Sequence, residues 1–326
     1  MTTNGHQGNA LAELRARTAL RAAGLDPRAP LARASSVTNE VWMTDTHVVR
    51  VNRGHNNRLA REAAIAAVLP AAVGYPTIRA HGGRAGEDWL VLDRVPGVPL
   101  AHCWPELTPL ERHQAVSQLA TRLRALHDTT APAGLPPVHG TPQLLEVNVE
   151  HPTASLLAAI EALARLDHVD PLLAQEAAEL VQGTATALDP FVSPTLVHGD
   201  LTFENVLWHE GEVTAVLDVE WARPGPRDID LDIILRCCAY PQLHVAPGFE
   251  AATRTEDYVD VPDWLREVYP RLFAYPRLAE RLRIFAIAYE VRELLAFPPT
   301  VPAAQQDPRS AYHRLRRVVQ RDSYLD

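Results

Sequence analysis

Apolar and polar positions in the first part of the chain follow two different periods. Apolar residues at helical spacing predict helices over residues 10–23 and 59–69, and Gly24 stops the first of them. Short β-forming runs, broken by polar turns, lie between and after these helices. They predict five strands, at residues 31–34, 41–44, 47–51, 76–79 and 89–93. The expected order is therefore three strands, one helix and two strands.

The pattern changes after the segment "VPGVP" at residues 95–99, whose Pro and Gly residues mark a domain boundary. Helical periods then dominate, and strand-like runs return only at 196–208 and 213–217. The helical periods predict helices at residues 109–127, 156–166 and 171–188 and a helical tail over 262–319. We therefore expect an N-terminal domain of residues 1–96 and a C-terminal domain of residues 97–326.

The composition is that of an ordinary globular protein. Of its 326 residues, 47% are hydrophobic and 22% are charged, and the net charge of -9 argues against general nucleic-acid binding. The sequence contains no run of eighteen apolar residues and no signal-peptide core, so no membrane association is expected. Its three cysteines lack metal-type or redox-type spacing. We expect a cytoplasmic protein, and nothing in the sequence implies a protein partner.

Charge is distributed unevenly between the two expected domains. Residues 1–96 hold 12 Arg and 8 acidic residues, whereas residues 97–326 hold 19 Arg and 32 acidic residues. The first domain would suit a polyanion such as a nucleotide, and the second a neutral or cationic small molecule. All 31 basic residues are arginine, which indicates biased codon usage and excludes any mechanism that requires lysine.

Candidate chemistry is concentrated in the stretch "LVHGDLTFENVLW" at residues 196–208. Its residues His198, Asp200 and Asn205 have the spacing H-x-D-x-x-x-x-N, in which an Asp can deprotonate an attacking hydroxyl and an Asn can hold a metal ion. Asp218 follows Asn205 by thirteen residues, at the end of the next strand-like run. Each residue alone could be a turn former. Their joint spacing between two strand-like runs favours a catalytic loop instead.

These residues resemble the aminoglycoside phosphotransferase family, the small-molecule relatives of protein kinases. The resemblance extends to four other segments, namely "WLVLDRVPG" at 89–97, "LRALHDT" at 123–129, "VLDVEWA" at 216–222 and "GPRDIDLDI" at 225–233. It implies an α+β fold of the two-lobed protein-kinase-like class. The small β-rich N-lobe would bind nucleotide, and the larger, mainly helical C-lobe would be the catalytic and substrate-binding lobe.

The resemblance also implies roles for single residues around the catalytic loop. Asp200 would be the catalytic base, and His198 would support the loop from below. Asn205 and Asp218 would hold Mg²⁺, with Glu220 as a direct or indirect ligand. In the segment Asp228–Asp232, a metal site of the type D-x-D-x-D is one alternative. The preferred interpretation is that Asp230 braces the catalytic loop while Asp228 and Asp232 are solvated.

Nucleotide would be bound by the N-lobe, where the kinase template has a Lys paired to a Glu. Here Arg50 stands at that position and Glu62 is its expected partner, although strand alternation alone does not say which face Arg50 occupies. The resemblance places the remaining nucleotide contacts in the phosphate-covering loop and in the connector between the lobes. They are Ser35, Ser36, Thr38 and Asp93.

An acidic group near residue 260 could recognise an amine-bearing substrate. Its members are Glu256, Asp257, Asp260 and Asp263, with Trp264 beside them. The alternative interpretation is a solvated acidic start of a helix.

The expected activity is transfer of the γ-phosphoryl group of ATP or GTP to a hydroxyl of a natural-product antibiotic, an aminoglycoside or another hydroxylated one, as in resistance kinases. A primary-metabolite kinase acting on choline, ethanolamine, homoserine or a sugar shares the same motifs. A protein kinase is disfavoured because D-F-G and A-P-E segments are absent from the sequence. A non-catalytic, nucleotide-binding pseudokinase is the last alternative, and the missing lysine is the reason to consider it.

Overall fold

The computed structural model describes residues 3–34, 36, 39–84, 86–139, 143–192 and 195–326. Contacts divide the chain into two compact units. The first unit is Met1–Thr141 with His198–Arg223, and the second is Pro142–Val197 with Pro224–Asp326. The domain boundary that the sequence suggests near residue 96, from the Pro and Gly residues of 95–99, stays a prediction.

The first unit is built on a five-stranded antiparallel sheet with the strand order β1-β2-β3-β5-β4. Its strands are β1 (Ala32–Ala34), β2 (Asn39–Met43), β3 (His47–Asn52), β4 (Ile78–Gly82) and β5 (Trp89–Asp93). Helix α2 (Arg58–Ala66) lies between β3 and β4 in the chain. The predicted order of three strands, one helix and two strands is therefore confirmed.

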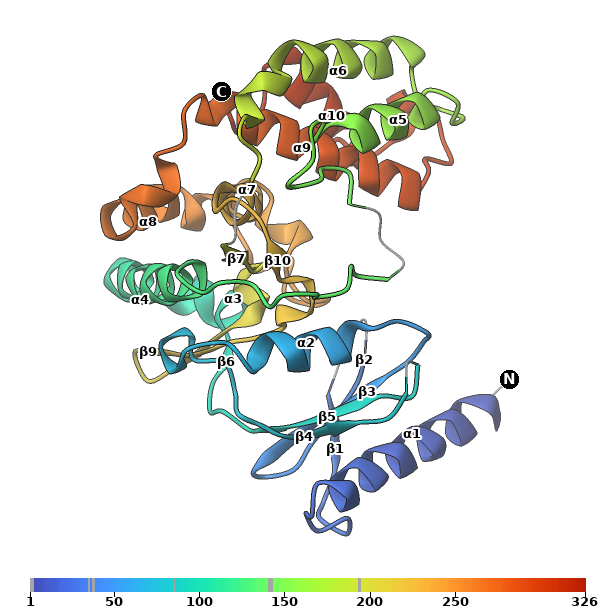
Figure 1. Ribbon diagram of the computed structural model, residues 1–326, viewed down its shortest axis with the longest axis vertical. Coiled ribbons are helices and arrows are strands. Elements are labelled where there is room, and N and C mark those ends of the chain that lie inside the picture. Colours follow the sequence, from blue (N-terminus) through green and yellow to red (C-terminus); the bar gives the residue numbers. More distant parts are fainter. Residues whose placement is uncertain (1–2, 35, 37–38, 85, 140–142, 193–194) are drawn as a thin grey trace. The chain divides into compact units, whose positions relative to one another are not determined.

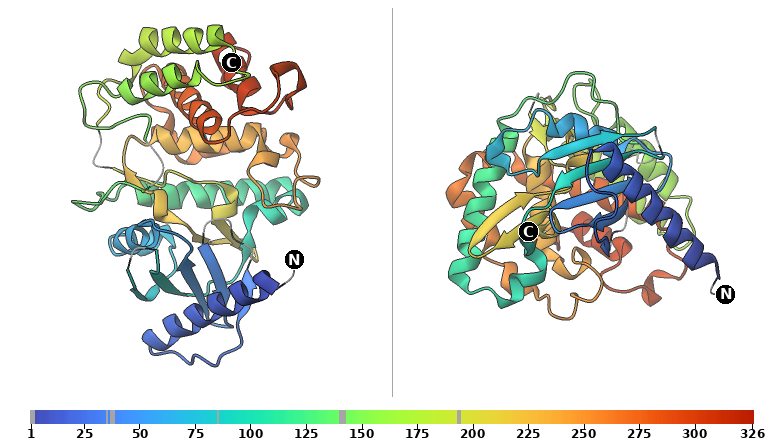
Figure 2. Two further views of the ribbon diagram at one scale, coloured as in Figure 1. Left: turned by 90° about the vertical axis from the view of Figure 1, so that its right-hand side faces the viewer. Right: turned by 90° about the horizontal axis from the view of Figure 1, so that it is seen from below.

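Two helices, α1 (Thr3–Ala22) and α2, cover opposite faces of this sheet (Figures 1 and 2). Val49 and Val51 of β3 pack against α1, whereas Leu90 and Leu92 of β5 pack against α2. Because side chains alternate between the two faces of a strand, Arg50 lies on the α2 face. The packing of the sheet thus decides the orientation that the sequence left open.

The rest of the first unit combines helices with a second, three-stranded sheet of order β6-β8-β9. Its strands are β6 (Val98–Pro99), β8 (Val206–His209) and β9 (Glu212–Val216), and its helices are α3 (Leu100–Cys103) and α4 (Pro109–His127). Helix α4 has the predicted bounds because Thr108 and Glu111 form a reciprocal capping box and Pro109 occupies the first helical position. The side chain of Gln118 accepts a hydrogen bond from the backbone N–H of Val213 at 2.7 Å, which ties α4 to β9.

The second unit is mainly helical, with α9 packed against α5, α6, α7 and α10. Its helices are α5 (Ala154–Leu163), α6 (Pro171–Thr184), α7 (Asp228–Ala239), α8 (Val261–Val268), α9 (Leu278–Ala296) and α10 (Ala311–Gln320). The predicted helical tail is thus three separate helices. The strands β7 (Leu196–Val197) and β10 (Arg223–Pro224) form a two-stranded pair. Short 3-10 turns connect many of the elements in both units.

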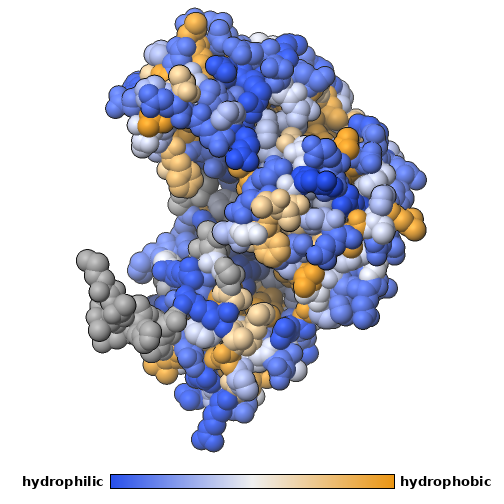
Figure 3. All heavy atoms as spheres, turned by 180° about the vertical axis from the view of Figure 1, so that it is seen from behind, coloured by the Kyte–Doolittle hydropathy of each residue, from blue (hydrophilic) through white to orange (hydrophobic). Residues whose placement is uncertain are grey.

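The described helices are too short or too polar to cross a membrane. The face drawn in Figure 3 is mostly hydrophilic, and its hydrophobic residues form small separate groups. Single exposed apolar side chains such as Leu110 and Phe297 are ordinary in globular proteins.

Candidate active site

The loop that precedes β8 is fixed by the ring of His198. This side chain is fully buried, and its Nε2 lies 2.9 Å from the carbonyl oxygen of Leu217. Its Nδ1 lies 3.3 Å from the backbone nitrogen of Asp200. Nε2 therefore donates to a carbonyl while Nδ1 accepts from an N–H, which is the pattern of a neutral imidazole. The ring of His198 thus links the backbone of Asp200 to the residue that follows β9, while its role in catalysis stays a prediction.

Asn205 completes the loop. Its side-chain Nδ2 donates to the carbonyl oxygen of Asp200 at 2.8 Å, and its own carbonyl accepts from the N–H of Leu217, also at 2.8 Å. Phe203–Asn205 forms the 3-10 turn η4, which leads directly into β8. Because the amide nitrogen is used inside the loop, Asn205 offers its amide oxygen to a ligand.

Asp218 follows β9 in a backbone conformation that is uncommon for a residue with a side chain. Its φ of 60° and ψ of 54° lie in the left-handed region. Both backbone groups of the preceding Leu217 are hydrogen-bonded, to Asn205 and His198, and these bonds hold the turn. Such backbone strain persists only where the surrounding structure fixes it, and it is frequent at functional sites.

Arg50 connects β3, α2 and the turn that contains Asp218. Its Nη1 lies 2.5 Å from Oε1 of Glu62, and its Nη2 lies 3.0 Å from Oδ1 of Asp218 and 3.3 Å from Oε2 of Glu220. The side chain of Arg50 is 12% exposed and that of Glu62 only 1%. The expected pairing of Arg50 with Glu62 is therefore present. A role of either residue in binding nucleotide stays a prediction.

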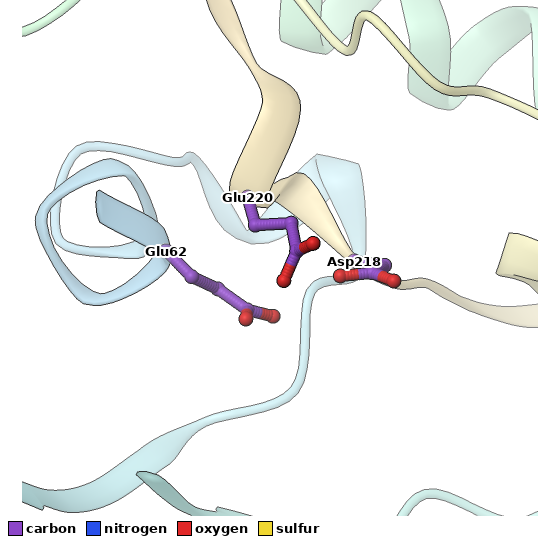
Figure 4. Close-up of side chains that lie close together, drawn as sticks. All are labelled: Glu62, Asp218 and Glu220. Carbon is purple, nitrogen blue, oxygen red and sulfur yellow. The ribbon is translucent and has the colours of Figure 1, made fainter. Parts of the chain in front are cut away.

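The carboxylates of Glu62, Asp218 and Glu220 form one acidic cluster, which we call the carboxylate triad. One oxygen from each lies within 4.8 Å of the others, and Figure 4 shows Glu62 from α2 approaching the two residues of the β9 turn. Burial raises the pKa of Glu62 to about 7, against the opposing effect of Arg50. Burial and the nearby Asp218 also raise the pKa of Glu220.

The electrostatic environment keeps Arg50 charged. Burial acts against the guanidinium charge, but Glu62, Asp218 and Glu220 outweigh it and raise the pKa of Arg50 well above its ordinary value. The guanidinium and the triad therefore stabilise each other in their charged forms.

The triad has the chemistry of a hard divalent-cation site. Carboxylate oxygens are the ligands that Mg²⁺ prefers. In addition, the fully buried Oε2 of Glu62 has no hydrogen-bond partner among the residues that the structure describes. The oxygen donors of the triad thus fit magnesium. Glu62 is one of these donors, although the sequence suggested only Asn205, Asp218 and Glu220 as ligands.

Two arginines at the start of α2 hold the turn after Asp218, and the sequence analysis did not assign them. Nη1 of Arg58 lies 3.3 Å from Oε1 of Glu220, and its guanidinium stacks 4.8 Å from the ring centre of Trp221. Arg61 is 2% exposed and donates to the carbonyl oxygens of Glu220, Ala222 and Pro136. The available signal was the spacing of Arg58, which precedes Arg61 by three residues and Glu62 by four, since residues so spaced share a helix face.

Two further contacts had no signal in the sequence. The hydroxyl of Tyr75 donates to Oε1 of Glu62 at 2.6 Å, and Nδ2 of Asn39 lies 3.4 Å from Oε2 of Glu220. Asn39 comes from β2 and Tyr75 from the segment before β4, so both reach the triad through the packing of distant segments.

Of the other four expected nucleotide contacts, Asp93 and Ser36 have partners other than the triad. Asp93 accepts from Arg79 at 2.6 Å and lies 3.8 Å from His47. The carbonyl oxygen of Ser36 accepts from Arg53 at 3.3 Å. Ser35 and Thr38 lie outside the described residues. A nucleotide role for these four residues stays a prediction.

In the second unit, the structure corrects one expectation about α7. Asp228 and Asp232 are not solvated but buried, and they form ion pairs with Arg281 and Arg236. Burial raises the pKa of both acids, and the arginines oppose this effect. The expectation of solvated acids is wrong because buried arginines from the same unit neutralise both of them. Asp230 is fully buried as well, and its bracing role stays a prediction.

The acidic group near residue 260 is largely at the surface, where Glu256, Asp260 and Asp263 are exposed. Asp257 and Trp264 are half-buried. Asp257 lies 3.3 Å from Arg254, and Asp263 lies 2.8 Å from Arg266. A substrate role for this group is therefore still a prediction.

Comparisons with known proteins identify a family and a fold. The model of the phosphotransferase enzyme family matches residues 29–268, and no curated protein matches the sequence. Among solved structures, a gentamicin complex of APH(2'')-IIa is similar at 14% identity with a TM-score of 0.61, covering 90% of this chain and 92% of that one. ADP-bound aminoglycoside phosphotransferase APH(2'')-Ib is similar at 15% identity with a TM-score of 0.60, covering 91% and 94%.

A third similar structure is a thermostable mutant of aminoglycoside phosphotransferase APH(4)-Ia in a ternary complex with ADP and hygromycin B. Its identity to this chain is 16% and its TM-score is 0.59, covering 94% of this chain and 97% of that one. At such identities the likeness establishes the fold. The predicted α+β, two-lobed protein-kinase-like class is thus confirmed.

Proposed function

This chain belongs to the phosphotransferase enzyme family, and from that premise we propose that it transfers the γ-phosphoryl group of ATP or GTP to a hydroxyl of a natural-product antibiotic. Aminoglycosides are the leading acceptor class, because the similar solved structures include complexes with hygromycin B and gentamicin. ADP in two of those structures supports a nucleoside triphosphate as the donor.

The observation that carries this proposal is the convergence of Arg50, Glu62 and Asp218 from three different elements. Phosphoryl transfer needs charge neutralisation and positioning more than covalent chemistry from the protein. A guanidinium tied to a buried glutamate and set against an acid in a strained turn supports both tasks. Arg50 would grip phosphate oxygens in a bidentate manner, as a planar guanidinium can.

Asp200 would act as the base. In this role its carboxylate orients the acceptor hydroxyl and takes its proton as the oxygen attacks the γ-phosphorus. The backbone of Asp200 is held on both sides, by His198 at its N–H and by Asn205 at its carbonyl. Two fixed peptide groups favour a reproducible approach of the carboxylate to the hydroxyl.

Magnesium would be held by Asn205 and Asp218, with Glu220 and Glu62 close by. When bound, it would supply neutralisation of the phosphate oxygens. The carboxylates of the protein would position the magnesium ion, and Arg58 would hold Glu220 in place through their ion pair.

A nucleotide-consumption screen tests the proposal. Release of ADP and GDP would be measured against aminoglycosides, other hydroxylated antibiotics, choline, ethanolamine, homoserine and sugars, with Asp200→Ala as the matched control. We expect acceptor-dependent release with at least one antibiotic, lost in the control, and a phosphorylated product in the mass spectrum. Release of ADP or GDP with a metabolite but with no antibiotic would show that the acceptor is a primary metabolite. Nucleotide binding without any turnover would instead identify a non-catalytic protein.

A further inference from the structure

Arg50 occupies the place in the carboxylate triad that a metal ion would take. Its two terminal nitrogens contact all three acids, Nη1 on Glu62 and Nη2 on both Asp218 and Glu220. The contacted oxygens come from helix α2 and from the turn that holds both Asp218 and Glu220, and the side chain of Arg50 is only 12% exposed between them. The triad therefore already contains a cation that the chain itself supplies.

A divalent ion would need the same oxygens. Magnesium binds oxygen at 2.0–2.1 Å, so oxygens on opposite sides of the ion lie roughly 4 Å apart. One oxygen from each carboxylate lies within 4.8 Å of the others, which is close to that spacing. Little rearrangement of the acids is needed for metal, but the guanidinium has to leave. Two cations in so small a buried space would also repel each other.

This arrangement depends on arginine rather than lysine. A lysine ammonium is a compact point charge, whereas a guanidinium presents five donors on a planar fork. The fork allows Arg50 to stay on Glu62 while its second nitrogen reaches Asp218 and Glu220. The substitution thus extends a two-residue pair into a four-residue network.

The charge balance of the network favours the arrangement in which Arg50 lies among the three acids. Three acids are set against Arg50 and Arg58, which contacts Glu220 through its other oxygen at 3.3 Å. Arg58 pairs with Glu220 and Arg50 pairs with all three acids, so the two arginines differ in the acids they neutralise. Loss of Arg50 would remove the guanidinium that pairs with the half-buried carboxylate of Asp218, and the triad would then attract another cation.

We propose that Arg50 is a resident counter-ion that excludes divalent cations from the carboxylate triad while no phosphate is bound. When a nucleotide binds, its phosphate groups draw the guanidinium of Arg50 away from the acids. This step alone rests on the proposed function. Metal then enters the triad together with nucleotide and not before it.

Titration of Mn²⁺ without nucleotide, followed by electron paramagnetic resonance, tests this exclusion. Manganese is a suitable probe because it shares the preference of magnesium for oxygen ligands. The titration is done at one fixed pH for the native chain and for every variant. We expect Arg50→Met to bind Mn²⁺ about 5- to 150-fold more tightly than the native chain, the usual range for coupling between two ligands.

Two controls locate the effect. Arg58→Met removes the same charge from the same cluster but leaves Arg50 on Asp218, so its gain in affinity should be clearly smaller. Adding Asp218→Asn to Arg50→Met should abolish the gain. Equal gains in both arginine variants, or a gain that survives Asp218→Asn, would overturn the proposal, because the metal would then respond to net charge or bind elsewhere.

A milder variant covers the case in which Arg50→Met does not fold. Arg50→Lys cannot span three carboxylates, so it should bind Mn²⁺ more tightly than the native chain. Unchanged affinity in Arg50→Lys or in Arg50→Met would overturn the exclusion even if phosphotransfer were demonstrated. Because no nucleotide or acceptor is added, an acceptor screen without any turnover leaves this result unaffected, and the two failures are distinguishable.

Discussion

A hydrogen bond of 2.9 Å joins Nε2 of His198 to the carbonyl oxygen of Leu217, the residue immediately before Asp218. The other ring nitrogen accepts from the backbone N–H of Asp200, and Leu217 in turn donates to the carbonyl of Asn205. The candidate base and both candidate metal ligands are thus held by one set of hydrogen bonds. Their separate roles can be distinguished by kinetics.

Asp200→Ala removes the candidate base and leaves the backbone of the loop in place. Turnover should fall by about 10²- to 10⁴-fold, the usual contribution of a positioned acid-base group, with little change in nucleotide affinity. Steady-state kinetics and nucleotide titration by calorimetry measure the two effects. Near-native turnover on the true acceptor would remove Asp200 from the mechanism.

Asp218→Ala and Asn205→Ala should both raise the magnesium concentration needed for half-maximal rate. We expect at least about a tenfold increase for Asp218→Ala, an effect that even partners of metal ligands produce. The increase for Asn205→Ala should be smaller because the amide carries no charge. Magnesium titrations of the rate decide this, and an unchanged requirement in Asp218→Ala would exclude that residue as a ligand.

Arg50→Ala should raise the nucleotide Michaelis constant and lower turnover together. Loss of a charge-assisted contact of ~1.5–3 kcal/mol corresponds to a decrease of about 10- to 150-fold in kcat/KM. Arg50→Lys should restore only part of it, because one ammonium cannot reproduce a bidentate fork. The comparison requires both ATP and GTP. If Arg50→Ala is native-like with both, another arginine neutralises the phosphates.

Glu62 should make stability depend on pH in an unusual direction. Burial raises its folded-state pKa from 4.5 to about 7, so between these pH values the folded chain binds a proton that the unfolded chain has lost. This residue's contribution to the free energy of unfolding therefore falls as pH rises from about 4.5 to about 7. Urea denaturation across this window should show a weaker fall in Glu62→Gln. Identical slopes in both proteins would contradict the raised pKa.

Arg61 should position the turn after Asp218 without touching a reactant. Arg61→Met leaves buried carbonyls of Glu220 and Ala222 without their donor, which costs about 1–3 kcal/mol for each unsatisfied group. We expect lower stability and also a higher magnesium requirement, because Asp218 begins the same turn.

Arg122 provides the matched control for Arg61, since it also donates to backbone carbonyls, those of Val73 and Val213. Burial lowers the pKa of both arginines. Arg122→Met should reduce stability and leave the magnesium requirement unchanged. If both variants alter magnesium dependence equally, Arg61 has only a structural role.

The local patterns of the sequence predicted the order of elements well. Strand and helix periods, and the capping box at Thr108, depend on residues a few positions apart, so the sequence contains them directly. The spacing of His198, Asp200 and Asn205 is local in the same sense, because all three belong to one loop. The chain by itself therefore identified the loop and the following Asp218, and the family resemblance of these motifs implied the fold class.

Tertiary structure alone decided what these residues contact. Arg50 lies 168 positions from Asp218 in the sequence, and its face of the sheet was settled by the packing of α1 and α2 on opposite sides. The same holds for the ion pairs that bury Asp228 and Asp232. Burial and partner choice arise from packing between distant segments, and a charged residue has the same local pattern whether it faces water or an arginine.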